Sequence, residues 1–100
     1  MAQVFYTNGD IKTIEPKNGT DFTLEEINEH INGYIEVIAI RDPEGLLKGE
    51  ELLMVIDEEG KLKNLPANLN ATRLAHNTQS IHVNDYIVGN AILCRRRELK

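Results

Sequence analysis

The sequence predicts an α+β domain, with a mainly antiparallel sheet of about five strands and two helices on one face of it. Three features lead to this prediction. Residues 34–40 and 52–56 are nearly continuous apolar runs rich in β-branched side chains, which is typical of sheet strands. Asn8-Gly9, a strong hairpin signal, separates two β-prone segments near the start. A capping box at Thr23 opens a helical pattern.

Length and composition indicate one small domain spanning residues 1–100. The chain has 100 residues, of which 41% are hydrophobic, so it can bury a core without a disulfide or a metal. The one cysteine, Cys94, lies in an apolar run and is interpreted as a small buried hydrophobe rather than a reactive thiol. Neither a signal-peptide pattern nor an apolar run of membrane-spanning length is present, so the expected location is cytoplasmic, without a membrane partner.

The first elements follow from local signals. Residues 3–6 and 11–15 form the two arms of the predicted hairpin, and both positions of the Asn8-Gly9 turn are expected to have positive φ. In the first helix, Thr23 and Glu26 form the capping box, and Gly33 is the expected left-handed stop.

The middle of the chain supplies the two strongest strands. Residues 34–40 are expected in the middle of the sheet, although Glu36 interrupts their apolar run. Residues 52–56 form a second central strand, which turns at a left-handed Gly60 into a short strand at 61–63.

The last third predicts a helix and a closing strand. Asn68 or Asn70 can cap a helix over residues 69–76. The final strand is expected over residues 86–94, where Gly89 indicates a bulge or the close approach of another backbone segment. The predicted core consists of Leu24, Ile27, Ile31, Ile35, Val37, Leu53, Val55, Leu74, Ile87 and Leu93.

Charge is distributed unevenly. The chain carries −5 overall, whereas residues 21–59 carry twelve acids and two bases, a net of −10. Such a surface repels phosphates and argues against direct nucleic-acid binding. The basic tail, residues 95–100, carries four bases and one acid; it either keeps a strand end soluble or forms a small anion-binding patch.

The richest polar neighbourhood lies at the start of the second helix. Backbone N–H groups and the positive end of the helix dipole meet there. We expect Asn68, Thr72 and Arg73 to form a ligand pocket there, with Glu36 at its rim as the partner of Arg73. The alternative is that an asparagine only caps the helix and that Arg73 pairs with a nearby acid.

Four short motifs, taken together, resemble a family of small uncharacterised domains found in bacteria, phages and plasmids. The resemblance covers roughly residues 11–94 and leaves out the hairpin at 4–14 and the basic tail. It implies a bacterial or phage cytoplasmic accessory protein of a mobile element, and it brings no assigned activity, cofactor or catalytic residue. The motifs are GYIEV at 33–37, DEEGKL at 57–62, LPANLNAT at 65–72 and DYIVGNA at 85–91.

Three functions follow as hypotheses. The leading one is a small non-enzymatic binding domain whose partner is a protein or a small anionic molecule, without a cofactor or a metal. The second is an acidic counter-defence protein that imitates nucleic acid, and it depends on acids arranged in rows on one surface. The third is a small enzyme with His76 as its base. A homodimer joined through a sheet edge stays open.

Overall fold

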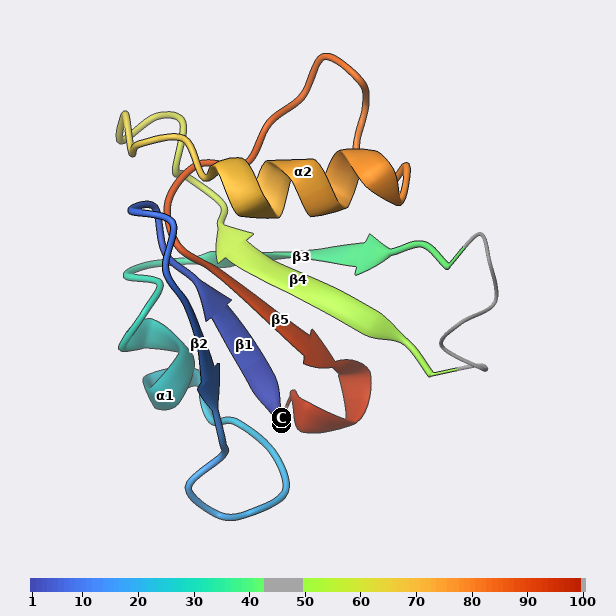
Figure 1. The fold of residues 1–100 in the computed structure, drawn as a ribbon. Coiled ribbons are helices and arrows are strands. Elements are labelled where there is room, and N and C mark those ends of the chain that lie inside the picture. Colours follow the sequence, from blue (N-terminus) through green and yellow to red (C-terminus); the bar gives the residue numbers. More distant parts are fainter. Residues whose placement is uncertain (43–49, 100) are drawn as a thin grey trace.

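The computed structural model describes residues 1–42 and 50–99, and it confirms the α+β class. Within these residues five antiparallel strands form one open sheet in the order β2-β1-β5-β4-β3, accompanied by two α-helices (Figure 1). The strands are β1 Ala2–Phe5, β2 Ile11–Ile14, β3 Ile35–Ile40, β4 Leu52–Asp57 and β5 Ala91–Arg95. The helices are α1 Leu24–Asn28 and α2 Leu69–Asn77, and a short 3₁₀ turn, η1, covers Arg96–Glu98.

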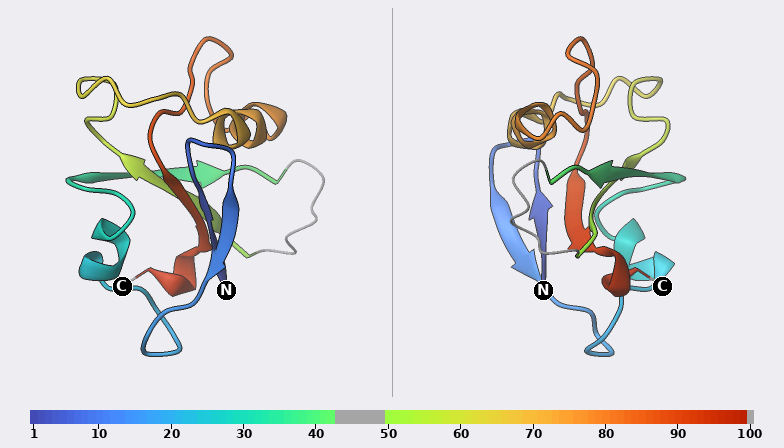
Figure 2. Two further views of the ribbon diagram at one scale, coloured as in Figure 1. Left: turned by 60° about the vertical axis from the view of Figure 1, so that its left-hand side comes forward. Right: turned by 90° about the vertical axis from the view of Figure 1, so that its right-hand side faces the viewer.

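The two helices cover opposite faces of the sheet, so the expectation of both on one face was wrong. Successive residues of a strand point to opposite faces, and β4 is apolar on both sides. Leu53 and Val55 pack in the cluster that contains Ile27 of α1, whereas Met54 and Ile56 pack in the cluster that contains Ala71 of α2. Figure 2 shows the helices on the two sides of the sheet.

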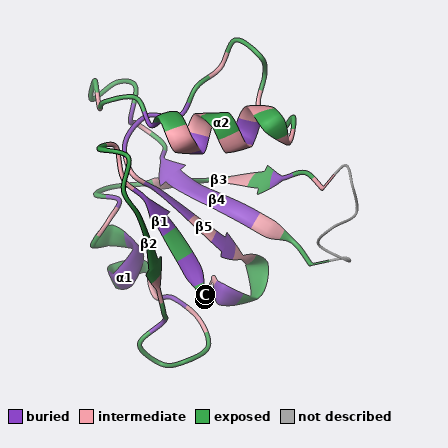
Figure 3. Ribbon diagram, viewed as in Figure 1, coloured by how far each residue is buried: buried purple, intermediate pink, exposed green. Residues whose placement is uncertain are grey.

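β4 is an interior strand, as expected, but β5 is the middle strand of the sheet and β3 lies at the edge. β4 pairs with β3 on one side and with β5 on the other. Residues Leu53–Asp57 are all buried, whereas most of β3 is exposed or half-buried, as the colouring of Figure 3 shows. The apolar run of β3 therefore did not indicate an interior position, because β4 pairs with β5 on its other side and the remaining strands follow beyond β5.

Local signals predicted the helix starts well. Thr23 caps α1, and the capping box with Glu26 is complete. The Glu26 carboxylate accepts hydrogen bonds from the backbone amides of Lys17, at 2.9 Å, and Thr23, at 3.1 Å. These bonds hold the pKa of Glu26 below its usual value. In the hairpin, Gly9 has φ 97° but Asn8 has no positive φ, so only one turn position is left-handed.

Two turn assignments were wrong. Gly60 does not have positive φ; instead, a Cβ there would lie 2.8 Å from a methyl group of Val88, so close packing requires the glycine. Residues 61–64 form consecutive turns rather than a strand, and Asn64 takes the left-handed conformation with φ 56°. The predicted bulge region does contain a close approach, since Gly89 has φ 75° and a Cβ there would lie 2.8 Å from Leu65.

The core is centred on the middle strands rather than on the helices. Two residues assigned to it, Leu24 and Val37, are 59% and 44% exposed. Met54, Val4 and Ile92, which were not assigned to it, are fully or almost fully buried. Across the described residues, we find no helix with the length and hydropathy that a membrane span requires.

Candidate functional site

Asn68 is a structural hub and is not available to a ligand. Its side chain is fully buried and bonds in three directions. The amide nitrogen donates to the carbonyls of Phe5 and Gly89, each at 2.8 Å, and the amide oxygen accepts from the backbone N–H of Ala71 at 3.1 Å. One side chain therefore joins β1, the approach to β5 and the first turn of α2.

Of the other residues of the sequence-predicted pocket, Thr72 lies beside Asn68, and its backbone N–H donates to the Asn68 carbonyl at 3.0 Å. Thr72 is half-buried, and its hydroxyl accepts a hydrogen bond from the backbone N–H of Ile87 at 2.9 Å. Arg73 is exposed on α2. Glu36 is exposed on β3, and no salt bridge joins it to Arg73 in the described part of the chain.

Glu36 instead lies on the rim of a small groove of about 120 Å³ beside β3. Lys61 and Asp85 line the same groove and form an ion pair with each other. This hydrogen bond to Asp85 is the main reason why the pKa of Lys61 is raised; the negative charge of Glu36 adds to the effect. Glu36 thus lies near Lys61, whose own ion-pair partner is Asp85.

A larger cleft, with a volume of about 300 Å³, opens at one end of the sheet. Four separate segments surround it: the turn after β1, the segment after α1, the stretch that follows β4, and the approach to β5. Its lining is made of Thr7, His30, Ile31, Asn32, Asp57, Lys63, Leu65, Pro66, Gly89 and Asn90.

An ion pair forms one side of this cleft. Asp57, the last residue of β4, has a side chain that is only 5% exposed, and its carboxylate lies 2.8 Å from Nζ of Lys63. The same Nζ donates to the carbonyl of Asn32 at 2.8 Å. A Cβ at Gly33 would lie 2.9 Å from this nitrogen, so a glycine leaves room for the lysine head. The pair therefore ties the β4 end to the segment before β3.

A second polar link closes the opposite side. The Asn90 side chain accepts from the backbone N–H of Thr7 at 3.3 Å and donates to the carbonyl of His30 at 3.2 Å. Nδ1 of His30 lies 3.5 Å from the hydroxyl of Tyr6. Hydrogen bonds between segments distant in sequence hold the cleft walls in place, which is the preorganisation that a binding site requires.

Two other potentially reactive side chains, His76 and Cys94, have structural roles. Nε2 of His76 lies 2.7 Å from the Asp85 carbonyl, so this ring anchors the loop after α2. Cys94 is 1% exposed, as the sequence indicated, and burial raises the pKa of its thiol to about 12.

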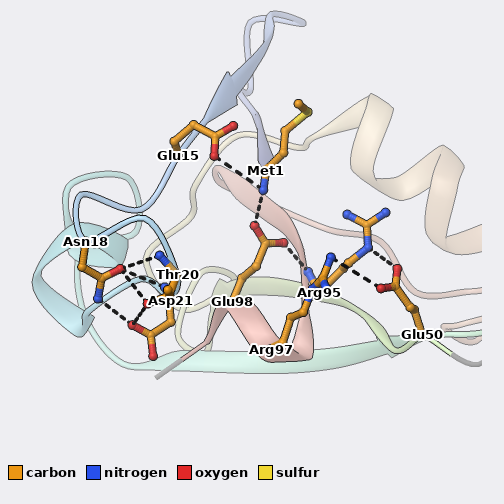
Figure 4. Close-up of polar contacts among 9 residues, drawn as sticks. All are labelled: Met1, Glu15, Asn18, Thr20, Asp21, Glu50, Arg95, Arg97 and Glu98. Carbon is orange, nitrogen blue, oxygen red and sulfur yellow. Dashed lines mark hydrogen bonds and ion pairs between the residues drawn. The ribbon is translucent and has the colours of Figure 1, made fainter.

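The basic tail pairs with acids that precede β4. Arg95 lies 2.5 Å and Arg97 3.5 Å from the carboxylate of Glu50 (Figure 4), and Arg96 pairs with Glu51. Much of the tail's charge is thereby balanced locally. Beside it, buried Glu98 accepts from the Met1 amino group at 2.5 Å and from the Arg95 backbone N–H at 2.9 Å.

Sequence reasoning missed the cleft because none of its polar residues has a diagnostic spacing. The signal that the sequence did contain was the set of four motifs. In the structure each motif places one residue in the cleft wall or directly beside it: Gly33, Asp57, Leu65 and Gly89. Motifs that are weak separately thus meet at one end of the sheet.

The comparisons with known proteins agree with that resemblance. The model of a family described as a domain of unknown function, DUF3846, matches residues 4–99. The chain belongs to this family. The match includes the hairpin and most of the basic tail, so the resemblance seen in the sequence was drawn too narrowly for this DUF3846 domain. Neither a curated protein nor a solved structure matches the chain significantly.

Proposed function

We propose that this DUF3846 domain is a small non-enzymatic binding domain whose ligand occupies the cleft at the end of the sheet. The observation that carries the proposal is the construction of the cleft. Four segments converge on about 300 Å³ of space, which lies within the usual size range of small-molecule sites. Loops positioned by a rigid sheet are where binding residues most often lie.

The lining indicates the chemistry of the ligand. Asp57 and Lys63 neutralise each other, so the cleft does not select a strongly charged molecule. Ile31, Leu65 and Pro66 supply apolar contact beside the hydrogen-bonding groups. A neutral or zwitterionic small molecule fits this lining better than the anionic one that Arg73 suggested in the sequence.

The alternative functions have less support. Charge mimicry of nucleic acid needs unpaired acids in rows, whereas Glu50, Glu51 and Asp57 of the acidic segment are each paired with a cation. His76 is not part of the cleft lining, and its Nε2 contacts the Asp85 carbonyl, so the cleft gives no support to a catalytic base at this position. The cellular setting, a cytoplasmic accessory protein of a bacterial mobile element, is proposed from the sequence resemblance alone.

The test is ligand screening by ¹H–¹⁵N NMR with neutral, zwitterionic and anionic metabolites. We expect a neutral or zwitterionic compound to shift the amides of Thr7, Asn32 and Asn90. The blocking variant is Asn32→Trp, at an exposed position of the cleft lining, and its matched control is Arg73→Trp, at an exposed position of α2. Binding should be lost in the first variant and kept in the second.

Two results would contradict the proposal. One is the absence of localised shifts at millimolar concentrations of every compound, because a site of this size should bind its own class at least that tightly. The other is a ligand that Arg73→Trp abolishes and Asn32→Trp does not, which would return the site to the start of α2.

A further inference from the structure

β3 is an edge strand that lacks several of the features that usually protect an edge, and its one charged residue is Glu36. The strand is six residues long and contains no proline, glycine or lysine, and among the described strands its one partner is β4. The opposite edge, β2, has four residues and carries Lys12, whose Nζ lies 5.8 Å from the Tyr6 ring. Short length and a lysine are common devices against edge pairing, and β3 has neither.

The hydrogen bonds of β4 show which backbone groups of β3 face outward. The N–H of Glu58 donates to the carbonyl of Tyr34 at 3.0 Å, which makes these two residues a hydrogen-bonded pair. Such pairs alternate along an antiparallel ladder. The N–H and C=O groups of Ile35, Val37 and Ala39 therefore point away from β4, and no described loop bonds to them.

The hydrogen bonds between β4 and β5 support this alternation. The N–H of Arg96 donates to the carbonyl of Glu51 at 3.0 Å, so Leu53 and Val55 direct their backbone groups toward β5. The alternate residues of β4 are then left to bond β3, as the first hydrogen bond requires.

We propose that the outer edge of β3 pairs antiparallel with β3 of a second copy of this chain, around a two-fold axis at Val37. In this register Val37 lies opposite itself, and Ile35 lies opposite Ala39 of the second copy in both directions. Each of these pairs exchanges two backbone hydrogen bonds, so about six bonds join the chains. An isologous contact of this kind is the usual basis of a dimer.

In this register the side chains of the two β3 strands are complementary to each other. One face brings together only apolar residues, including Val37, which is 44% exposed in the single chain. On the other face, Glu36 lies opposite Ile38 of the second copy rather than opposite a second carboxylate. Moving the axis to Glu36 would place the two glutamates directly opposite each other, which is destabilising. Charge thus selects the register at Val37, independently of the ligand cleft.

The test is the oligomeric state of the whole chain, measured by sedimentation velocity up to millimolar protein. We expect a reversible dimer that strengthens with salt, because each copy carries a net charge of −5. Val37→Lys places two cations opposite each other and should weaken the dimer at least about tenfold. The matched control, Thr13→Lys on the exposed β2 edge, should leave it unchanged.

A separate measurement tests the register of the two β3 strands. In a mixed sample of labelled and unlabelled protein, isotope-filtered NMR should show a contact between the Val37 methyl groups of two copies. Far-UV circular dichroism of each variant confirms that it is folded. A chain that stays monomeric at millimolar concentration, or a dimer that Thr13→Lys weakens and Val37→Lys does not, would overturn the proposal.

Discussion

Replacement of Asn68 by alanine should cost this small domain a large part of its stability. The change removes three hydrogen bonds, to Phe5, Gly89 and Ala71, from a fully buried side chain. At a net value of about 1 kcal/mol each, they account for about 3 kcal/mol. Two backbone carbonyls and one N–H also lose a partner in the interior, so we expect a total of about 3 to 5 kcal/mol.

Urea unfolding followed by far-UV circular dichroism measures this change. With an m-value of about 1 to 3 kcal/mol/M, the midpoint should fall by at least about 1 M. Asn68→Asp tests whether the Asn68 side chain does more than cap α2, because aspartate caps a helix as well as asparagine does. It cannot donate to the two carbonyls and should therefore be about as damaging as alanine.

Asn70→Ala is the matched control, because the Asn70 side chain makes a single exposed bond to the carbonyl of Gly9 at 3.1 Å. It should lower the free energy of unfolding by less than about 1 kcal/mol. The reasoning fails if Asn68→Asp has wild-type stability, or if the alanine variants at positions 68 and 70 unfold at the same urea concentration.

Three further predictions concern other positions. Gly89→Ala should destabilise the fold by more than Gly9→Ala, which should cost about 1 kcal/mol, because both have positive φ but only Gly89 would force a new Cβ against Leu65; thermal unfolding compares them. The pKa of Glu26 is lowered in the folded state, so its stabilising contribution is present above the ordinary carboxyl pKa and is lost as the pH falls through the lowered value; Glu26→Gln should reduce the acid sensitivity in urea titrations between neutral and acidic pH. Cys94, with its pKa raised to about 12, should react with a thiol reagent only in the unfolded protein, and rapid labelling without denaturant would contradict its burial.

The sequence alone determined those features that depend on a few neighbouring residues. Thr23 and Glu26 satisfy the first amides of α1, and Asn68, one of the two asparagines that the sequence offered as a cap, satisfies one at the start of α2. The apolar run of β4 also required burial on both faces, which made its central place predictable. The α+β class follows from these elements because a sheet with two apolar faces must be covered.

Only the tertiary structure decided how the elements are placed. An apolar strand can lie inside a sheet or at its edge. β3 lies at the edge because its one partner among the described strands is β4, which pairs with β5 on its other side. The helices separated to opposite faces because both faces of β4 needed cover. The cleft depends on pairs such as Asn90 and His30, which are 60 residues apart, and no local pattern encodes such a contact. Local hydrogen bonds depend on neighbouring residues and can be predicted from the sequence, whereas a site made from four segments forms only once the sheet has joined them.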